Sequence, residues 1–335
     1  MLEIAPPSPT VGGRRALAVL LVGSLLATAV YLGLFHFVLT RPMTLGDMTR
    51  MIDRKEKIAE AVGPGAIIIA AGSNGRYSHS CATLSELLDR PCANMGVAAS
   101  IQIDFLFDWV EKVAKPGDLV YVPLEYPLWS ADRSDFLSDD IGPAYFSKDV
   151  ATLSELGWDR LAHGAFAFNV RFAIESVFEK LLVRMGVARR VGVTASDLND
   201  YGDMVGHDAK AAAAYSDYLA KVRWRVPNNA ISDTTRALVS NFIKAMKDRG
   251  VVVVGGLSTT FDDQPVPDSV IAPWRALFED NGAAFVMLPN KSQYPRSEFF
   301  DTTAHLQQQY QIEHSVALAP LLRPLLPPLQ ASSGS

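Results

Sequence analysis

The sequence predicts an α/β protein, a three-layer sandwich with a mainly parallel five-stranded sheet, a helical insertion and one N-terminal transmembrane helix. Short apolar runs bounded by turn residues alternate with helix-like stretches over most of the chain. An uncharged apolar segment precedes them, and a long interval, about residues 130–229, separates the third run from the fourth. These three observations define the expected architecture.

Five apolar runs are expected to form the sheet, because each has the length of a buried strand. They cover residues 66–71, 92–95, 119–123, 251–254 and 284–288. Helix-like stretches lie between them, at residues 82–88, 101–114, 234–248 and 270–280. Such alternation favours a parallel sheet with helices on both faces.

The interval at about 130–229 is too long for an ordinary crossover. It contains helical patterns at 168–183 and 208–222, and we expect an inserted helical cap at the functional edge of the sheet. No linker composition supports the alternative, a separate small domain. The domain with its insertion should span residues 63–325, followed by a disordered tail at 326–335.

The N-terminal segment at 16–40 is long enough to cross a bilayer as a helix. Arg14 and Arg15 precede it and Arg41 follows, which places the N-terminus in the cytoplasm and the domain outside the membrane. Residues 1–15 are expected to be disordered and 41–62 to form a helical stalk. The alternative is a signal peptide cleaved after Ala27-Thr28-Ala29, but the apolar run continues past that site, which favours an anchor.

Composition excludes some classes of protein. The 335 residues carry a net charge of -5, which argues against a general nucleic-acid binder. The two cysteines, Cys81 and Cys92, form either a disulfide in an oxidising compartment or two buried thiols. Neither has the spacing of a zinc site, and we expect no metal and no cofactor.

Ser73 is the first candidate catalytic residue. It follows the run at 66–71 within Gly72-Ser73-Asn74-Gly75. Ligands in open α/β sheets bind beyond the carboxyl ends of the strands, where this serine is expected. Its alternative role is to cap the next helix.

Asp301 and His305 are the second and third candidates. We expect Asp301 just before a helix that starts near Thr303, so that its carboxylate orients the imidazole of His305 as a general base. The alternative is a helix cap with a surface histidine, and His314 is a weaker rival for the base.

Three further segments are candidates for binding. Asn94-Met95-Gly96 could supply oxyanion donors, from the Asn94 amide or the Gly96 N–H, as could the N–H of Ser73. Glu125 and Tyr126, after the third run, either bind substrate or pack. The polar stretch at 199–203 is a substrate-side loop or, more in keeping with its composition, a solvated turn.

Taken in order, these segments resemble the SGNH/GDSL hydrolase superfamily, and within it the membrane-anchored branch of the D-alanine transfer protein and alginate-type O-acetylation proteins. The matching segments are Gly72-Ser73-Asn74, Asn94-Met95-Gly96, residues 115–126 and residues 300–306. The chain departs from the pattern in having Ala71-Gly72 before the serine and no clear third-block asparagine.

The resemblance implies a flavodoxin-like fold in which Ser73 is the nucleophile, Asp301 and His305 complete the triad, and Gly96 contributes to the oxyanion hole with Asn94 as a substitute donor. It implies extracytoplasmic transfer of an O-acyl group, acetyl being expected, to or from a cell-surface polysaccharide through a serine acyl-enzyme. The expected location is the bacterial inner membrane with the domain in the periplasm, and the expected partner is a multi-spanning membrane O-acyltransferase. The alternative is a catalytically inactive assembly or glycan-binding subunit of an exopolysaccharide machine.

Overall fold

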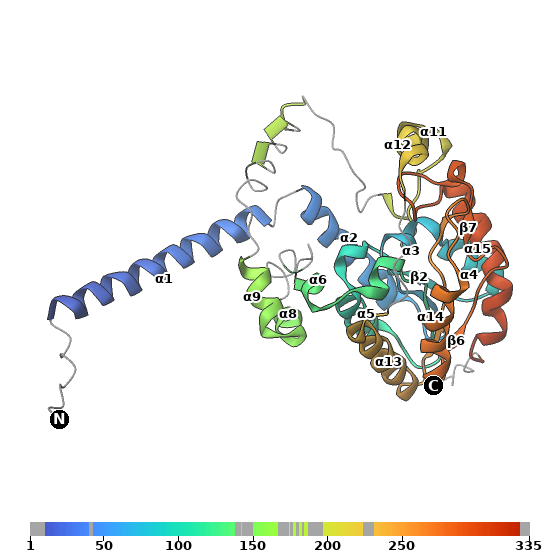
Figure 1. Ribbon diagram of the computed structural model, residues 1–335, viewed down its shortest axis with the longest axis horizontal. Coiled ribbons are helices and arrows are strands. Elements are labelled where there is room, and N and C mark those ends of the chain that lie inside the picture. Colours follow the sequence, from blue (N-terminus) through green and yellow to red (C-terminus); the bar gives the residue numbers. More distant parts are fainter. Residues whose placement is uncertain are drawn as a thin grey trace.

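The computed structural model describes residues 11–39, 43–137, 142, 150–166, 174, 177–178, 181–182, 184–186, 197–223 and 231–328 (Figure 1). Disorder was predicted for residues 1–15 and 326–335. Positions 1–10 and 329–335 lie outside the described residues. The remainder of the first stretch is helical, because α1 (Val11–Leu39) already begins at Val11.

The central sheet is parallel and has the strand order β2-β1-β3-β4-β6. It confirms the prediction of a mainly parallel five-stranded sheet, although four of these five strands are shorter than their apolar runs and β4 is shifted by one residue. The strands are β1 (Ile67–Ile69), β2 (Cys92–Asn94), β3 (Leu119–Val122), β4 (Val252–Gly255) and β6 (Ala284–Phe285). A separate parallel pair, β5 (Thr260–Phe261) and β7 (Gln293–Tyr294), was not predicted, because strands of two residues leave no periodic signal.

Helices cover both faces of the sheet. Ile68, Val120 and Val253 point toward one core cluster, while their neighbours Ile67 and Val254 point toward the other, as expected for alternating strand side chains. The first cluster is closed by α2 (Met43–Ala61), α5 (Ile103–Val113), α13 (Asp233–Asp248) and α14 (Asp268–Asp280), and the second by α4 (Cys81–Leu88) and α15 (Gln308–Leu322).

The helix α2 does not stand clear of the domain as a stalk. Met51, Ile52 and Ala59 are buried in the core on one side of it. Lys55 is buried with them, and its ammonium group donates to the carbonyl oxygen of Asn94 at 2.6 Å. The charges of this segment favoured a stalk, but Lys55, the one buried charge among the described side chains of α2, donates to backbone carbonyls.

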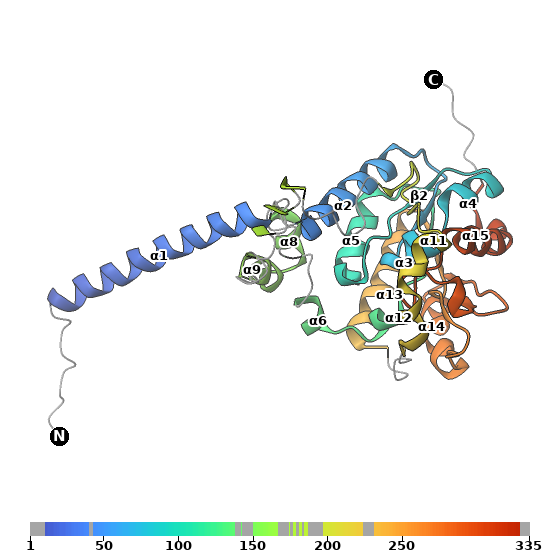
Figure 2. The same ribbon diagram turned by 90° about the horizontal axis from the view of Figure 1, so that it is seen from above.

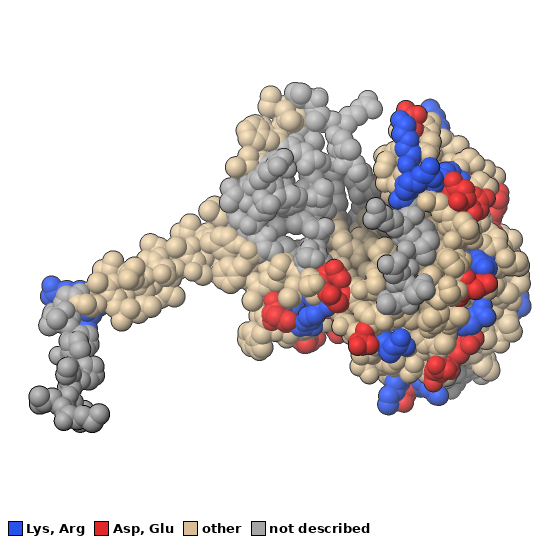
Figure 3. Space-filling view, in the orientation of Figure 1, with Lys and Arg blue, Asp and Glu red and all other residues tan. Residues whose placement is uncertain are grey.

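Among the described residues, one helix, α1, is long and apolar enough to cross a membrane, and its candidate span is Gly13–Leu34. Figure 1 shows it projecting away from the sheet domain. On the face drawn in Figure 3, charged atoms gather at its amino-terminal end and the rest of the helix is uncharged.

The described parts of the insertion between β3 and β4 are mostly helical, apart from the loop at 197–207, in which Leu198 pairs with Met204. Most of the helix predicted at 168–183 lies outside the described residues, and the one predicted at 208–222 is broken into three short helices. The elements are η2 (Tyr126–Ser130), α6 (Arg133–Leu137), α8 (Val150–Leu156), α9 (Trp158–Phe166), α11 (Ala209–Ala212), η4 (Ala213–Tyr215) and α12 (Ser216–Lys221). The remaining elements are α3 (Ser73–Ser78), η1 (Ala99–Ile101), η5 (Arg296–Glu298) and η6 (Arg323–Leu325).

Cys81 and Cys92 form a disulfide, which decides between the two alternatives left by the sequence. It joins the first residue of α4 to the first residue of β2. Both sulfurs are buried in the second core cluster, where a cross-link fixes an edge strand to the helix that covers it.

Reduction of this disulfide should lower the stability of the protein. Closing a loop of this length removes denatured-state entropy worth about 2–3 kcal/mol. We therefore expect the thermal midpoint of the full chain in detergent to fall by several degrees in dithiothreitol. A Cys81→Ala/Cys92→Ala variant should show the lower midpoint with or without reductant; an unchanged midpoint in both experiments would contradict the expectation.

Candidate functional site

The site lies where β1 and β3 end side by side. Because the strand order reverses between these strands, their connections diverge and leave room at the carboxyl edge. Glu125 follows β3 and accepts the N–H of Gly72 at 3.0 Å and the N–H of Asn74 at 2.8 Å. The residue between these two donors is Ser73, so the carboxylate fixes the backbone on both sides of the serine.

Glu125 is buried, and burial raises the pKa of its carboxyl group. The N–H groups of Asn74 and Gly72 and the nearby His305 act in the opposite direction on the same pKa. In this structure Glu125 supports the turn from within, so a role in binding substrate would be indirect.

Ser73 is the first residue of α3 and is half-buried. Neither its hydroxyl nor its backbone N–H has a hydrogen-bond partner within the described parts of the chain. The side chain is therefore open to a ligand, and the N–H is a candidate oxyanion donor.

Asp301 and His305 lie on one tight turn. The pairing of Phe299 with Leu306 closes the turn, and the N–H of Phe300 donates to the carbonyl oxygen of His305 at 2.8 Å. The imidazole Nδ1–H donates to Asp301 Oδ1 at 2.6 Å. This carboxylate fixes the tautomer and leaves Nε2 as the basic nitrogen.

The predicted helix start near Thr303 is wrong, since α15 begins at Gln308. A bridge-closed turn, rather than a helix end, brings the carboxylate to the imidazole. The sequence spacing could not distinguish these geometries, because both place residues four apart within reach of each other.

Tyr77 brings His305 to the helix that carries Ser73. The two rings are stacked, with centroids 4.1 Å apart. Tyr77 follows Ser73 by four residues on α3, so both side chains lie on the same face one turn apart. Asp301 and His305 are thus hydrogen-bonded to each other. Ser73 lies on the face of α3 that carries Tyr77, but it makes no hydrogen bond to the imidazole.

A buried polar cluster, which sequence reasoning missed, holds α3 against the His305 turn. The Thr259 hydroxyl donates to Asn74 Oδ1 at 2.9 Å. The Ser78 hydroxyl donates to the carbonyl oxygen of Ala304 at 2.9 Å and accepts the N–H of Leu306 at 3.2 Å. Thr259 and Asn74 each follow a strand of the sheet, so the carboxyl-end rule contained the signal that could have found them.

The predicted oxyanion residues after β2 are occupied by protein partners. The Gly96 N–H donates to Asn94 Oδ1 at 3.1 Å. Asn94 Nδ2 donates to Gly75 O at 2.8 Å, to His79 O at 3.1 Å and to Asp203 Oδ1 at 2.9 Å. An oxyanion role for either group would require these hydrogen bonds to be exchanged.

Gly96 lies against the start of α3. A Cβ at this position would come within 2.6 Å of the carbonyl oxygen of Gly72 and 2.8 Å of the Arg76 backbone nitrogen. Only glycine allows so close an approach. Gly96 therefore sets the position of the helix that carries Ser73.

Residues in two other predicted binding segments are held by contacts within the protein. Tyr126 packs against Trp129, with ring centroids 4.5 Å apart. The stretch at 199–203 is not a simple solvated turn, since Asp203 is buried and caps α4 by accepting the N–H groups of Cys81 and Ala82 at 2.9 and 3.0 Å.

Behind α3, two buried histidines form a chain. His79 Nδ1 must donate to the Asn74 carbonyl oxygen at 3.3 Å, so its Nε2 accepts from His314 Nε2 at 3.2 Å. His314 Nδ1 then accepts the Tyr294 hydroxyl at 2.7 Å. This arrangement needs both rings neutral, and burial lowers the pKa of His79 to about 4 and that of His314 well below its usual range.

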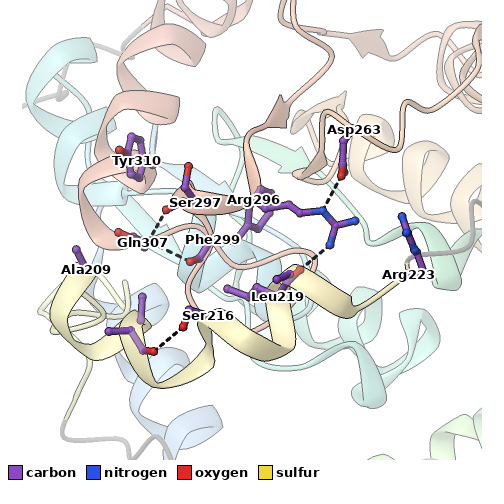
Figure 4. Close-up of a pocket in the computed structure, with 13 residues that line it drawn as sticks. Ala209, Ser216, Leu219, Arg223, Asp263, Arg296, Ser297, Phe299, Gln307 and Tyr310 are labelled. Atoms are coloured by element: carbon purple, nitrogen blue, oxygen red, sulfur yellow. Dashed lines mark hydrogen bonds and ion pairs between the residues drawn. The ribbon is translucent and has the colours of Figure 1, made fainter.

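A separate cleft of about 720 Å³ lies beside the His305 turn. Figure 4 shows it between α11–α12 and the segment from Arg296 to Tyr310, with Arg296 reaching Asp263. Its lining includes Ser216, Arg223 and Gln307, which can hydrogen-bond a polar ligand. Ser73, Asp301 and His305 do not line it.

In the portion of the chain that is described, no three His, Cys, Asp or Glu side chains are placed to share a metal ion. Comparison with protein-family models, with curated proteins and with solved structures finds no match.

Replacing Gly96 by alanine should disturb the site. The added methyl group must displace the start of α3, at a cost of about 1–3 kcal/mol. We expect Gly96→Ala to lower the thermal midpoint and reduce the reactivity of Ser73. Gly63→Ala is the matched control, because a Cβ there meets nothing within 4 Å; equal behaviour of the two variants would contradict the packing argument.

The buried histidines should make stability depend on pH. His79 and His207, which packs against Tyr77, both have a pKa of about 4 because of burial, against about 6.5 in the unfolded chain. The unfolded state binds more protons between these values, so stability is lost as pH falls from about 6.5 to 4, by about 1.4 kcal/mol per pH unit for each histidine.

The test is the slope of unfolding free energy against pH for a His314→Gln variant. Removing one buried imidazole should reduce the slope over this range by about one proton. His163→Gln, at a partly exposed position on α9, is the control and should keep the wild-type slope. A variant at His314 with an unaltered slope would show that this ring does not stay neutral in the folded state.

Proposed function

We propose that the protein is a membrane-anchored serine O-acyltransferase or esterase that moves an acyl group, acetyl being the expected one, to or from a cell-surface polysaccharide. One observation carries the proposal: the imidazole of His305, hydrogen-bonded to Asp301, stacks on Tyr77, one helical turn from an open Ser73. A carboxylate, an imidazole and an accessible hydroxyl at one edge of the sheet are the groups that serine acyl transfer requires.

In the first half-reaction, Ser73 Oγ attacks the ester carbonyl carbon while His305 Nε2 takes the hydroxyl proton. Asp301 stabilises the imidazolium, and the Ser73 N–H donates to the oxyanion. Collapse of the tetrahedral intermediate breaks the bond to the leaving alcohol, which receives the proton from His305. The acyl group remains on Ser73 as an ester.

In the second half-reaction, a sugar hydroxyl or water attacks this ester and gives its proton to His305. The proton returns to Ser73 Oγ as the acyl group leaves. Because Ser73 and His305 are not hydrogen-bonded here, substrate binding must bring the hydroxyl to Nε2, by rotation of the serine side chain and a small shift of the turn. Apo sites of this kind often have such loose geometry.

The disulfide and the apolar α1 support a location outside the cytoplasm. Disulfides persist in oxidising compartments, and the arginines at the start of α1 favour a cytoplasmic N-terminus. We place the domain in the periplasm, with the polysaccharide in the cleft beside the His305 turn. Its acyl donor would come from a multi-spanning membrane O-acyltransferase.

A second candidate function is a catalytically inactive subunit that binds glycan or supports assembly of an exopolysaccharide machine. The observation that favours it is that Asn94 and Gly96 already hydrogen-bond to other protein groups. Of the three candidate oxyanion donors named above, only the Ser73 N–H is then free of a partner within the described residues. In this case the polar cleft, and not Ser73, would be the working site.

Labelling with a fluorophosphonate tests the two candidates. The probe phosphonylates an activated serine and displaces fluoride, so wild-type protein should be labelled and Ser73→Ala should not. Asp301→Asn should label at least about tenfold more slowly, because the imidazole loses its orienting carboxylate.

Ser85→Ala is the matched control, since Ser85 lies on α4 away from the turn and should leave labelling unchanged. Absence of labelling in folded wild-type protein would contradict the enzyme and favour the binding subunit. Labelling that persists in Ser73→Ala would exclude Ser73 as the nucleophile.

A further inference from the structure

We propose that the helical insertion carries a second membrane contact, an apolar flank that lies on the bilayer surface beside α1. The flank consists of Trp158, Ala162 and Phe166 on α9 together with Ile174, Val177, Phe178, Leu181, Leu182 and Met185. This inference does not depend on the chemistry of Ser73. It depends on side chains that the described structure leaves on the outside of the protein.

The first part of the flank is held rigidly. On α9, Trp158, Ala162 and Phe166 are spaced by four residues and are all exposed, with Trp158 79% and Phe166 62% accessible. The other side of the helix is anchored by Arg160, which is buried and pairs with Asp104 of α5 at 2.7 Å. The ion pair therefore fixes which face of α9 points outward.

The second part has the pattern of a surface-lying amphipathic helix. Positions 174, 177, 178, 181, 182 and 185 follow one helical face, and all six carry large apolar side chains. Each of them is exposed, from 39% for Leu182 to 63% for Met185. An apolar face of this length facing water is unfavourable, since even the burial of one such side chain is worth about 1.5–3 kcal/mol.

The position of α1 indicates that the lipid bilayer covers the flank. The ring of Tyr31 stacks on that of Phe166, with centroids 5.7 Å apart and planes 13° apart. Tyr31 lies within the last turn of the candidate span, which ends at Leu34. When α1 crosses a bilayer, Phe166 is therefore at the depth where hydrocarbon meets headgroups.

Two further observations agree with this placement. Figures 1 and 2 both show α8 and α9 beside the carboxyl-terminal end of α1. A tryptophan at the edge of the flank is typical of membrane interfaces. The sequence at 171–190 also has more basic than acidic residues, which favours anionic lipid; they are Arg171, Lys180, Arg184, Arg189 and Arg190 against Glu175 and Glu179.

The experiment uses the full chain in vesicles of phosphatidylethanolamine and phosphatidylglycerol. Because the two native cysteines are paired, a single introduced cysteine is the one free thiol available for a nitroxide label. Phe178→Cys labels the flank, and Ser176→Cys, a polar position outside the apolar pattern at 174, 177, 178 and 181, is the matched control. Leu25→Cys, within the span of α1, gives the value for the bilayer interior.

The readout is the collision rate of each nitroxide with oxygen, which concentrates in lipid, relative to a water-soluble nickel chelate. We expect the oxygen-to-nickel ratio at position 178 to be several-fold above that at 176 and to approach that at 25. Equal, water-like ratios at 178 and 176 would overturn the proposal. A label at 178 shielded from both reagents would also overturn it, because it would show that protein, from this chain or a second copy, covers the flank.

Discussion

The geometry of the site depends on one buried carboxylate. Glu125 has left water to accept two backbone N–H groups, and those donors belong to the residues on either side of Ser73. Taking a carboxylate out of water is costly, and hydrogen bonds from two backbone donors offset that cost. Without Glu125, the first turn of α3 would have two buried donors without partners, and Ser73 would lose its fixed backbone.

Around this interaction, the polar groups that close the carboxyl edge of the sheet are satisfied by one another. Asn74, Ser78 and Thr259 link α3 to the turn that carries Asp301 and His305, while Asn94 links it to β2. Such networks hold elements in one arrangement, because breaking any member leaves its partner buried and unpaired. Ser73 is outside the network, so its side chain can move toward a substrate while its neighbours stay in place.

The sequence predicts the parallel sheet well, because apolar runs are local signals, and the expected pairing of Asp301 with His305 is present. It fails where a distant backbone group decides the outcome. From the sequence, Lys55 is expected to be an exposed charge. In the structure it is buried, because its ammonium group donates to the distant carbonyl oxygen of Asn94. From the sequence, Asp203 is expected to belong to a solvated turn. In the structure its carboxylate accepts the N–H of Cys81 at the start of α4. The role of Glu125 is hidden for the same reason, since its partners lie 51 and 53 residues away.

The packing of α2 on the domain has a mechanical consequence. Met51 is already in the core, and the candidate membrane span ends at Leu34, so only a short length of chain connects that span to the sheet domain. Most of this connection lies in α1 and α2, where the rise is about 1.5 Å per residue, so it is short. If α1 spans a bilayer, a domain on so short a connection stays near the membrane surface, and any ligand must reach it there.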